Sequence, residues 1–172
     1  DLMEKFFAYG HKIIHLPTLK IFAIKTELLN PDNFDAFVFT SANAVRNLKL
    51  TNTNKNLHCF CVGLITEKIA RLSGFTNTSS AGGTVNALKN LIMISDKVNK
   101  NSNLAYFCGD NVSYDLDLEL IKEGLKIKKI INYSSEVISD LNNENKKLIE
   151  SYPPDLIYIY SARSAESFVA IV

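Results

Sequence analysis

The sequence lacks any long apolar run and any marked excess of charge. No stretch approaches the roughly 18 consecutive apolar residues that a membrane-spanning helix requires. The 19 lysine and arginine residues nearly balance the 18 aspartate and glutamate residues, which leaves a formal net charge of +1 at pH 7. So small a charge argues against broad electrostatic attraction to nucleic acid or to an anionic membrane surface. We therefore expect neither kind of partner.

Cysteine is scarce, and its number is odd. Cys59, Cys61 and Cys108 all lie in hydrophobic segments, which suits a reducing compartment better than a disulfide framework. The opening residues 1–5 do not resemble a secretory signal peptide, so we expect a cytoplasmic protein. Cys59 and Cys61 share one face of a predicted strand beside His58, which makes a metal site conceivable. No second ligand pair follows in the sequence, so we interpret these thiols as core residues and expect no metal.

Several familiar catalytic and binding patterns are also missing from the sequence. Neither Gly-x-Gly-x-x-Gly nor Gly-x-x-x-x-Gly-Lys-Ser/Thr occurs, which argues against a phosphate-binding loop. There is no set of serine, histidine and aspartate for acyl transfer and no carboxylate pair at a diagnostic spacing.

Apolar runs alternate with amphipathic segments along the whole chain. Continuous apolar strands separated by helices indicate parallel sheets covered on both faces, so the predicted fold class is α/β. The predicted strands are Lys12–Leu16, Leu19–Ile24, Ala36–Thr40, His58–Val62, Leu104–Cys108, Lys128–Tyr133 and Leu156–Tyr160. The predicted helices are Leu2–Tyr9, Asn43–Leu50, Thr66–Leu72, Val85–Ile94, Ser113–Glu123, Asn142–Ser151 and Ala162–Ile171.

Small polar residues and glycines follow several predicted strands at the point where a helix begins. In an open parallel sheet the ligand crevice lies at the carboxyl ends of the strands. The N–H groups and positive dipole ends of helices there suit a carboxylate or a phosphate. Serine, threonine and aspartate are also ordinary helix caps, which is the simpler interpretation of each residue alone. The residues at these junctions are Thr40, Ser41, Gly63, Thr66, Gly83, Thr84, Gly109, Asp110 and Ser161.

One segment is echoed late in the chain. Residues Phe37–Leu48 align without a gap with Ile157–Phe168, and both contain an apolar strand, a Ser-Ala turn and an amphipathic segment. Such an echo suggests two similar α/β units. The first copy is followed by a second strand and the turn Val62–Thr66, whereas the sequence ends at Val172 before a matching strand. We therefore expect the second unit to lack a final strand and helix here.

Taken in order, these segments resemble the uroporphyrinogen-III synthase family. Each motif is a generic strand, turn and helix, and their joint order carries the resemblance. The family often has an arginine in the helix after Gly109, where this sequence has Ser113. The matching segments are Phe39–Arg46, Val62–Thr66, Ser73–Phe75, Gly83–Leu88, Tyr106–Asp110, Leu116–Leu120 with Gly124, Ile131–Tyr133 and Ser161–Ala165.

The resemblance implies two α/β domains with mostly parallel sheets, joined by a two-stranded crossover linker, with the active site in the interdomain cleft. Residues 21–136 would form one continuous domain. Residues 1–20 and 137–172 would form the other, incomplete at its C-terminus. We expect a monomer.

The resemblance also implies a substrate and a reaction. The substrate would be hydroxymethylbilane, a linear tetrapyrrole with eight carboxylates. A lyase would close it with inversion of ring D and loss of water, without a cofactor. Tyr133 matches the family's tyrosine and would hydrogen-bond the departing hydroxyl as a weak acid, although an edge tyrosine that only packs its ring is the alternative. Asn43 joins the junction residues as a substrate-binding candidate. The other class we consider is a two-lobed small-molecule binding protein without catalytic activity.

Overall fold

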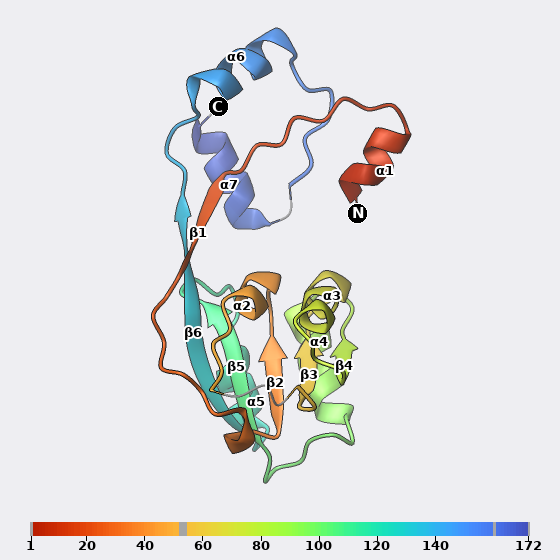
Figure 1. The fold of residues 1–172 in the computed structure, drawn as a ribbon, viewed down its shortest axis with the longest axis vertical. Coiled ribbons are helices and arrows are strands. Elements are labelled where there is room, and N and C mark those ends of the chain that lie inside the picture. The colour runs from red at the N-terminus through yellow and green to blue at the C-terminus, as the bar shows by residue number, and fades with distance from the viewer. Residues whose placement is uncertain (1, 52–54, 160, 172) are drawn as a thin grey trace. The chain divides into compact units, whose positions relative to one another are not determined.

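The computed structural model describes residues 2–51, 55–159 and 161–171, and its central feature is a six-stranded sheet (Figure 1). The sheet order is β1-β6-β5-β2-β3-β4. The pairs β2–β3, β2–β5, β3–β4 and β5–β6 are parallel, which confirms the predicted α/β class. The strands are β1 (Leu19–Ala23), β2 (Ala36–Phe39), β3 (His58–Cys61), β4 (Thr78–Ser80), β5 (Asn103–Gly109) and β6 (Lys126–Val137).

Helices follow most of the strands. A short 3₁₀ helix at Pro31–Asn33 precedes β2. No helix among the described residues is both long and apolar enough to cross a bilayer. The α-helices are α1 (Leu2–Ala8), α2 (Ala42–Arg46), α3 (Leu64–Leu72), α4 (Val85–Ile94), α5 (Leu116–Lys122), α6 (Asn143–Ser151) and α7 (Ala162–Ile171).

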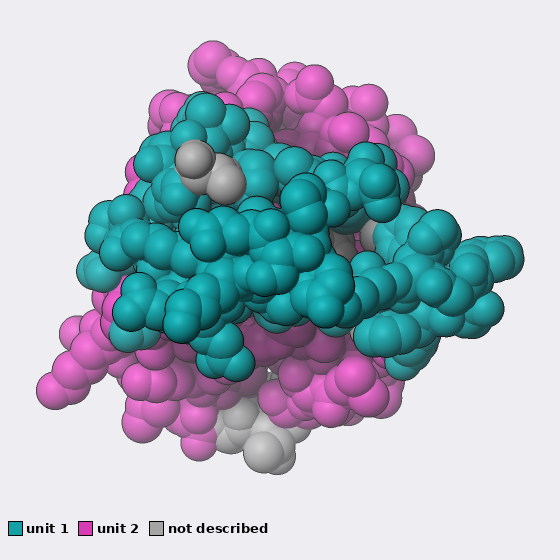
Figure 2. Space-filling view, turned by 90° about the horizontal axis from the view of Figure 1, so that it is seen from above, with its two compact units in different colours: residues 1–20, 136–172 teal, residues 21–135 magenta. Residues whose placement is uncertain are grey.

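The chain divides into two compact units, coloured separately in Figure 2. Unit 1 contains Asp1–Lys20 and Glu136–Val172, and unit 2 contains Ile21–Ser135. Both boundaries fall within the paired strands β1 and β6. The Ile24 N–H donates to the Asn132 carbonyl and the Ile138 N–H donates to the Thr18 carbonyl, so these two strands run antiparallel.

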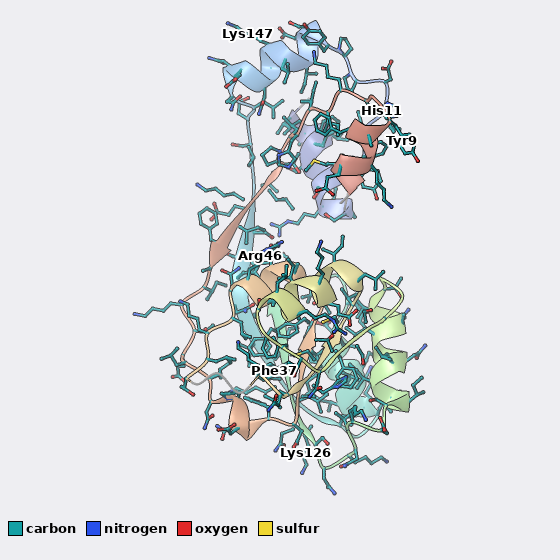
Figure 3. The ribbon with its side chains drawn as sticks, turned by 45° about the vertical axis from the view of Figure 1, so that its right-hand side comes forward. Tyr9, His11, Phe37, Arg46, Lys126 and Lys147 are labelled. Atoms are coloured by element: carbon teal, nitrogen blue, oxygen red, sulfur yellow. The ribbon has the colours of Figure 1, made fainter. Side chains whose placement is uncertain are left out.

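The core of unit 2 surrounds β2, whose four residues are fully buried. Alternate side chains point to opposite faces of the sheet. Phe37 and Phe39 pack on one face against Phe107, with ring centroids 5.1 and 5.4 Å apart, while Val38 packs on the other face with Tyr106. Phe37, labelled in Figure 3, lies inside this unit. Each buried phenylalanine stabilises the fold by about 1.5–3 kcal/mol.

Two predicted strands are wrong. Residues 12–16 and 156–159 belong to no strand, and Tyr160 lies outside the described residues. An apolar run becomes a strand only where a neighbouring strand pairs with its backbone, and the sheet holds neither segment. Residues 156–159 accordingly remain between 38% and 71% exposed.

Two further differences concern the edges of unit 2. Strand β4 was not predicted, because its residues Thr-Ser-Ser carry no apolar signal. Helix α2 ends at Arg46, four residues earlier than predicted. The chain turns away because Leu29 and Leu50 form a parallel bridge, in which the Leu29 N–H donates to the Lys49 carbonyl and the Thr51 N–H donates to the Leu29 carbonyl.

Candidate functional site

The carboxyl ends of four parallel strands lie along one edge of the sheet in unit 2, which we call the carboxyl edge. The register pairs Phe39 of β2 with Cys61 of β3 and with Phe107 of β5, and Cys61 with Ser80 of β4. The turns that follow these strands therefore meet at the same edge. They contain the candidates Thr40, Ser41, Gly63, Gly83, Thr84, Gly109 and Asp110.

Two glycine turns touch each other at this edge. The Gly83 N–H donates to the Val62 carbonyl at 2.9 Å, and Gly83 has a φ of 91°, which favours glycine. A Cβ atom added to Gly63 would lie 3.4 Å from the Gly83 Cα. Gly63 precedes α3, and the Thr84 hydroxyl caps α4 by accepting from the Ala87 N–H at 3.2 Å. The starts of helices α3 and α4 are thus held side by side, with little side-chain bulk between them.

Tyr133 covers the end of β5. A bulge in β6 shifts the register, so that Gly109 lies opposite Tyr133 rather than Asn132. A Cβ atom added to Gly109 would lie 2.8 Å from the Tyr133 Cζ and 3.0 Å from the phenol oxygen. Glycine at position 109 therefore makes room for the ring, and the half-buried Tyr133 carries its hydroxyl beside the carboxyl edge.

The Asp110 carboxylate is engaged with backbone groups. Its Oδ1 atom accepts from the Asn111 N–H at 2.9 Å and from the Ser135 N–H at 3.3 Å, while the Asp110 N–H donates to the Tyr133 carbonyl. These bonds fasten the turn after β5 to β6. They favour the simpler interpretation of Asp110, as a residue that caps the turn.

The turn after β2 and helix α2, which follows it, contain three candidates and a cation that sequence reasoning missed. Ser41 caps α2 by accepting from the Asn43 N–H at 3.1 Å, and the Thr40 hydroxyl lies 3.3 Å from the Tyr106 hydroxyl. The exposed Arg46 donates to the Asn43 Oδ1 at 3.2 Å, and no ion pair joins Arg46 to an acidic residue in the described part of the chain. Figure 3 shows Arg46 and Lys126 at opposite ends of unit 2.

Two candidates lie elsewhere. Thr66 is in the first turn of α3 but is only 5% exposed, so its side chain is turned into the fold. Ser161 belongs to unit 1, where its hydroxyl accepts from the Ser164 N–H at 3.1 Å at the start of α7. Ser161 and Ser41, aligned in the sequence echo, therefore play the same capping role in their helices.

The three cysteines are buried free thiols. Burial raises the pKa of Cys61 to about 12 and that of Cys108 to about 11, and it raises the pKa of Cys59 as well. The His58 Nε2 atom lies 3.0 Å from the Ser79 hydroxyl, and burial lowers the pKa of this histidine. In the part of the chain that the structure describes, no three His, Cys, Asp or Glu side chains are grouped so that they could hold a metal ion.

One open hollow lies away from the carboxyl edge. Its volume is about 440 Å³, and its lining includes His58 and Thr78, which begin β3 and β4, together with Lys97. It is therefore at the amino ends of the strands. None of its described lining residues begins a helix or is one of the candidates. We therefore place the candidate site at the carboxyl edge instead.

Comparison with known proteins identifies related sequences and folds. The family model described as uroporphyrinogen-III synthase HemD matches residues 1–172. The fold resembles the uroporphyrinogen-III synthetase of Helicobacter pylori 26695, with a TM-score of 0.63 and 20% identity over 91% of this chain and 71% of that chain. It also resembles a mutant uroporphyrinogen III synthase of the extremely thermophilic bacterium Thermus thermophilus, with a TM-score of 0.50 and 15% identity over 85% of this chain and 61% of that chain. No curated protein matches the sequence.

Proposed function

We propose that this chain, which belongs to the uroporphyrinogen-III synthase family, cyclises hydroxymethylbilane to uroporphyrinogen III in heme biosynthesis. The family match over residues 1–172 is the observation that carries the proposal. The reaction class would be that of a lyase, since the ring closes with inversion of ring D and loss of water.

For this substrate the enzyme must supply correct orientation more than reactive side chains. Its electron-rich pyrroles expel the terminal hydroxyl themselves and give a stabilised cation, which closes without inversion when no enzyme is present. Catalysis then consists largely of holding one geometry and excluding another. A rigid edge of backbone groups suits this task better than a charged nucleophile would.

The carboxyl edge offers such groups to an anionic ligand. Helices α3 and α4 have nine and ten residues, and their N-terminal N–H groups and positive dipole ends favour carboxylates. Gly63 and Gly83 leave space for a ligand to approach the backbone closely. The exposed guanidinium of Arg46 adds a positive charge at the end of α2. These features support substrate binding at this edge.

Tyr133 is our candidate for the catalytic residue. Its phenol lies beside Gly109 at the carboxyl edge, where it could donate a hydrogen bond to the departing hydroxyl. A phenol is a weak acid, so this hydrogen bond would assist departure without full proton transfer.

We further propose that the two compact units correspond to the two domains of this family. Their boundaries fall at residues 20/21 and 135/136. The partner of the chain would be the small-molecule substrate, and the chain would act as a monomer.

A coupled assay tests this function. Hydroxymethylbilane is generated enzymatically, the purified protein is added, and the uroporphyrinogen isomers are resolved by chromatography. We expect isomer III to replace isomer I as protein is added. A two-lobed binding protein without catalytic activity would leave the isomer ratio at its protein-free value.

A further inference from the structure

The buried Tyr106 contacts a residue of the carboxyl edge from inside the fold. Tyr106 lies in β5 opposite Val38 of β2 and is only 1% exposed. Thr40 is two residues beyond Val38, so its side chain lies on the same face, displaced toward the carboxyl edge. The Tyr106 and Thr40 hydroxyl oxygens are 3.3 Å apart, and Thr40 is half-buried.

Either hydroxyl of this pair could be the donor. Burial raises the pKa of the Tyr106 phenol, so the group keeps its proton, and its other hydrogen-bonding neighbour is the Cys108 thiol. Sulfur is a weak acceptor compared with a hydroxyl oxygen. A phenol that donates to the Thr40 oxygen leaves the hydroxyl hydrogen of Thr40 for another acceptor.

We propose that the Tyr106 phenol donates to the Thr40 oxygen and that Tyr106 is thereby a positioning residue, which orients the Thr40 hydroxyl so that it donates to a carboxylate of the substrate at the carboxyl edge. The proposal rests on the proposed function. A free threonine hydroxyl rotates among staggered positions, and the bond from Tyr106 removes those in which the hydrogen points back into the fold. A hydrogen bond to a charged acceptor is stronger than one between neutral groups, so the orientation affects substrate affinity.

A double-mutant cycle tests whether Tyr106 acts through Thr40. The variants are Thr40→Val, Tyr106→Phe and the two combined, measured for KM, kcat and isomer ratio. We expect each single change to raise KM about three- to tenfold, as loss of one hydrogen bond would. In the Thr40→Val background, Tyr106→Phe should raise KM no further. An equal rise in both backgrounds would show that Tyr106 acts independently and would overturn the proposal.

Two further variants separate positioning from packing. Thr40→Ser keeps the hydroxyl and should keep KM within about twofold of the original value. Cys108→Ala removes the other neighbour of the Tyr106 phenol and should also leave KM unchanged. If Tyr106→Phe lowers only the melting temperature while KM stays the same, the bond merely satisfies a buried phenol and the proposal is wrong. If the unmodified protein forms no isomer III, the proposed function fails, and this proposal fails with it.

Discussion

Gly109 and Tyr133 lie in close contact at the carboxyl edge. The phenol ring lies so close that any other residue at position 109 would bring its Cβ atom to 2.8 Å from the Tyr133 Cζ. A sequence shows that Tyr133 ends an apolar strand, but it does not show the β6 bulge that sets the ring over Gly109.

This contact predicts the effect of a single methyl group. Gly109→Ala should lower the free energy of unfolding by about 1–3 kcal/mol, because the new Cβ forces the ring aside. It should also lower turnover, since the phenol moves. Gly82→Ala is the matched control, because its Cβ would meet only the Ala87 Cβ at 3.8 Å. Urea denaturation of both variants checks the prediction, and equal stability of the two would contradict it.

The hydroxyl of Tyr133 can be tested apart from its ring. Tyr133→Phe should reduce kcat by at least about tenfold, as expected when a weak acid is lost, and should change stability by no more than about 1 kcal/mol. Tyr114→Phe serves as the control, since this half-buried tyrosine packs on the opposite face of the sheet. Steady-state kinetics at saturating substrate test this prediction. An unchanged kcat would show that the Tyr133 hydroxyl takes no part in the catalytic step.

The buried thiols predict a dependence on pH. Burial holds the pKa of Cys61 near 12 and that of Cys108 near 11, above the usual 9.0. In the unfolded chain these thiols ionise first, so the free energy of unfolding should fall as the pH rises from about 9 toward 11. At pH 8 the folded protein should resist iodoacetamide, and the unfolded protein should react at all three cysteines.

Mass spectrometry of the alkylated protein and denaturation at pH 8 and pH 10 provide the measurements. Cys108→Ala should show a shallower loss of stability with pH, because one of the titrating thiols is gone. Rapid labelling of the native protein would mean that the thiols are not buried.

At the scale of single elements, the sequence predicted correctly those helix boundaries that neighbouring residues determine. Helices α4 and α7 begin and end at the predicted residues, and local caps fix their starts, Thr84 for α4 and Ser161 for α7. The predictions failed where contacts between distant residues determine the structure. Helix α2 is short because residues after Arg46 pair with Leu29, far back in the sequence.

Distant contacts also hold α2 in place. The Asn132 amide of β6 donates to the Ala44 carbonyl at 2.7 Å. The sequence pattern around either residue does not indicate this hydrogen bond. The contact between Tyr106 and Thr40 is of the same kind, since it joins residues 66 positions apart in the sequence. The sequence could therefore indicate which residues lie at the carboxyl edge, but not which buried side chains form hydrogen bonds with them.

Thr84 allows the cap of one element to be tested. Thr84→Ala removes the acceptor for the Ala87 N–H and should lower the free energy of unfolding by about 1 kcal/mol. Thr84→Ser keeps that acceptor and should stay within about 0.5 kcal/mol. The comparison requires only equilibrium denaturation, and identical values for the two variants would mean that the cap contributes nothing.

At the scale of the whole molecule, the order of motifs was more informative than any motif alone. The sequence pattern predicted the α/β class and the family, and the mostly parallel sheet and the family match confirm both. The two predicted strands at residues 12–16 and 156–159 failed, because hydrophobicity without a pairing partner does not make a sheet. The assignment of the two units as domains stays a prediction.

Helix α3 offers the most direct test of the claim that the carboxyl edge binds an anionic substrate. Leu64 begins this helix at the edge and Leu72 ends it, and their side chains are 76% and 74% exposed. A glutamate at either position loses little packing, and one at the helix start is favoured by the dipole. Only Leu64→Glu places a negative charge where the substrate carboxylates would bind.

The decisive measurement is KM and isomer ratio for Leu64→Glu, Leu64→Gln and Leu72→Glu in the coupled assay. We predict that Leu64→Glu raises KM about tenfold or more and shifts product toward isomer I, as like charges placed at close range would. Leu72→Glu should behave as the unmodified protein, and Leu64→Gln should lie close to it. Equal effects of Leu64→Glu and Leu72→Glu, or none from either, would contradict substrate binding at this edge.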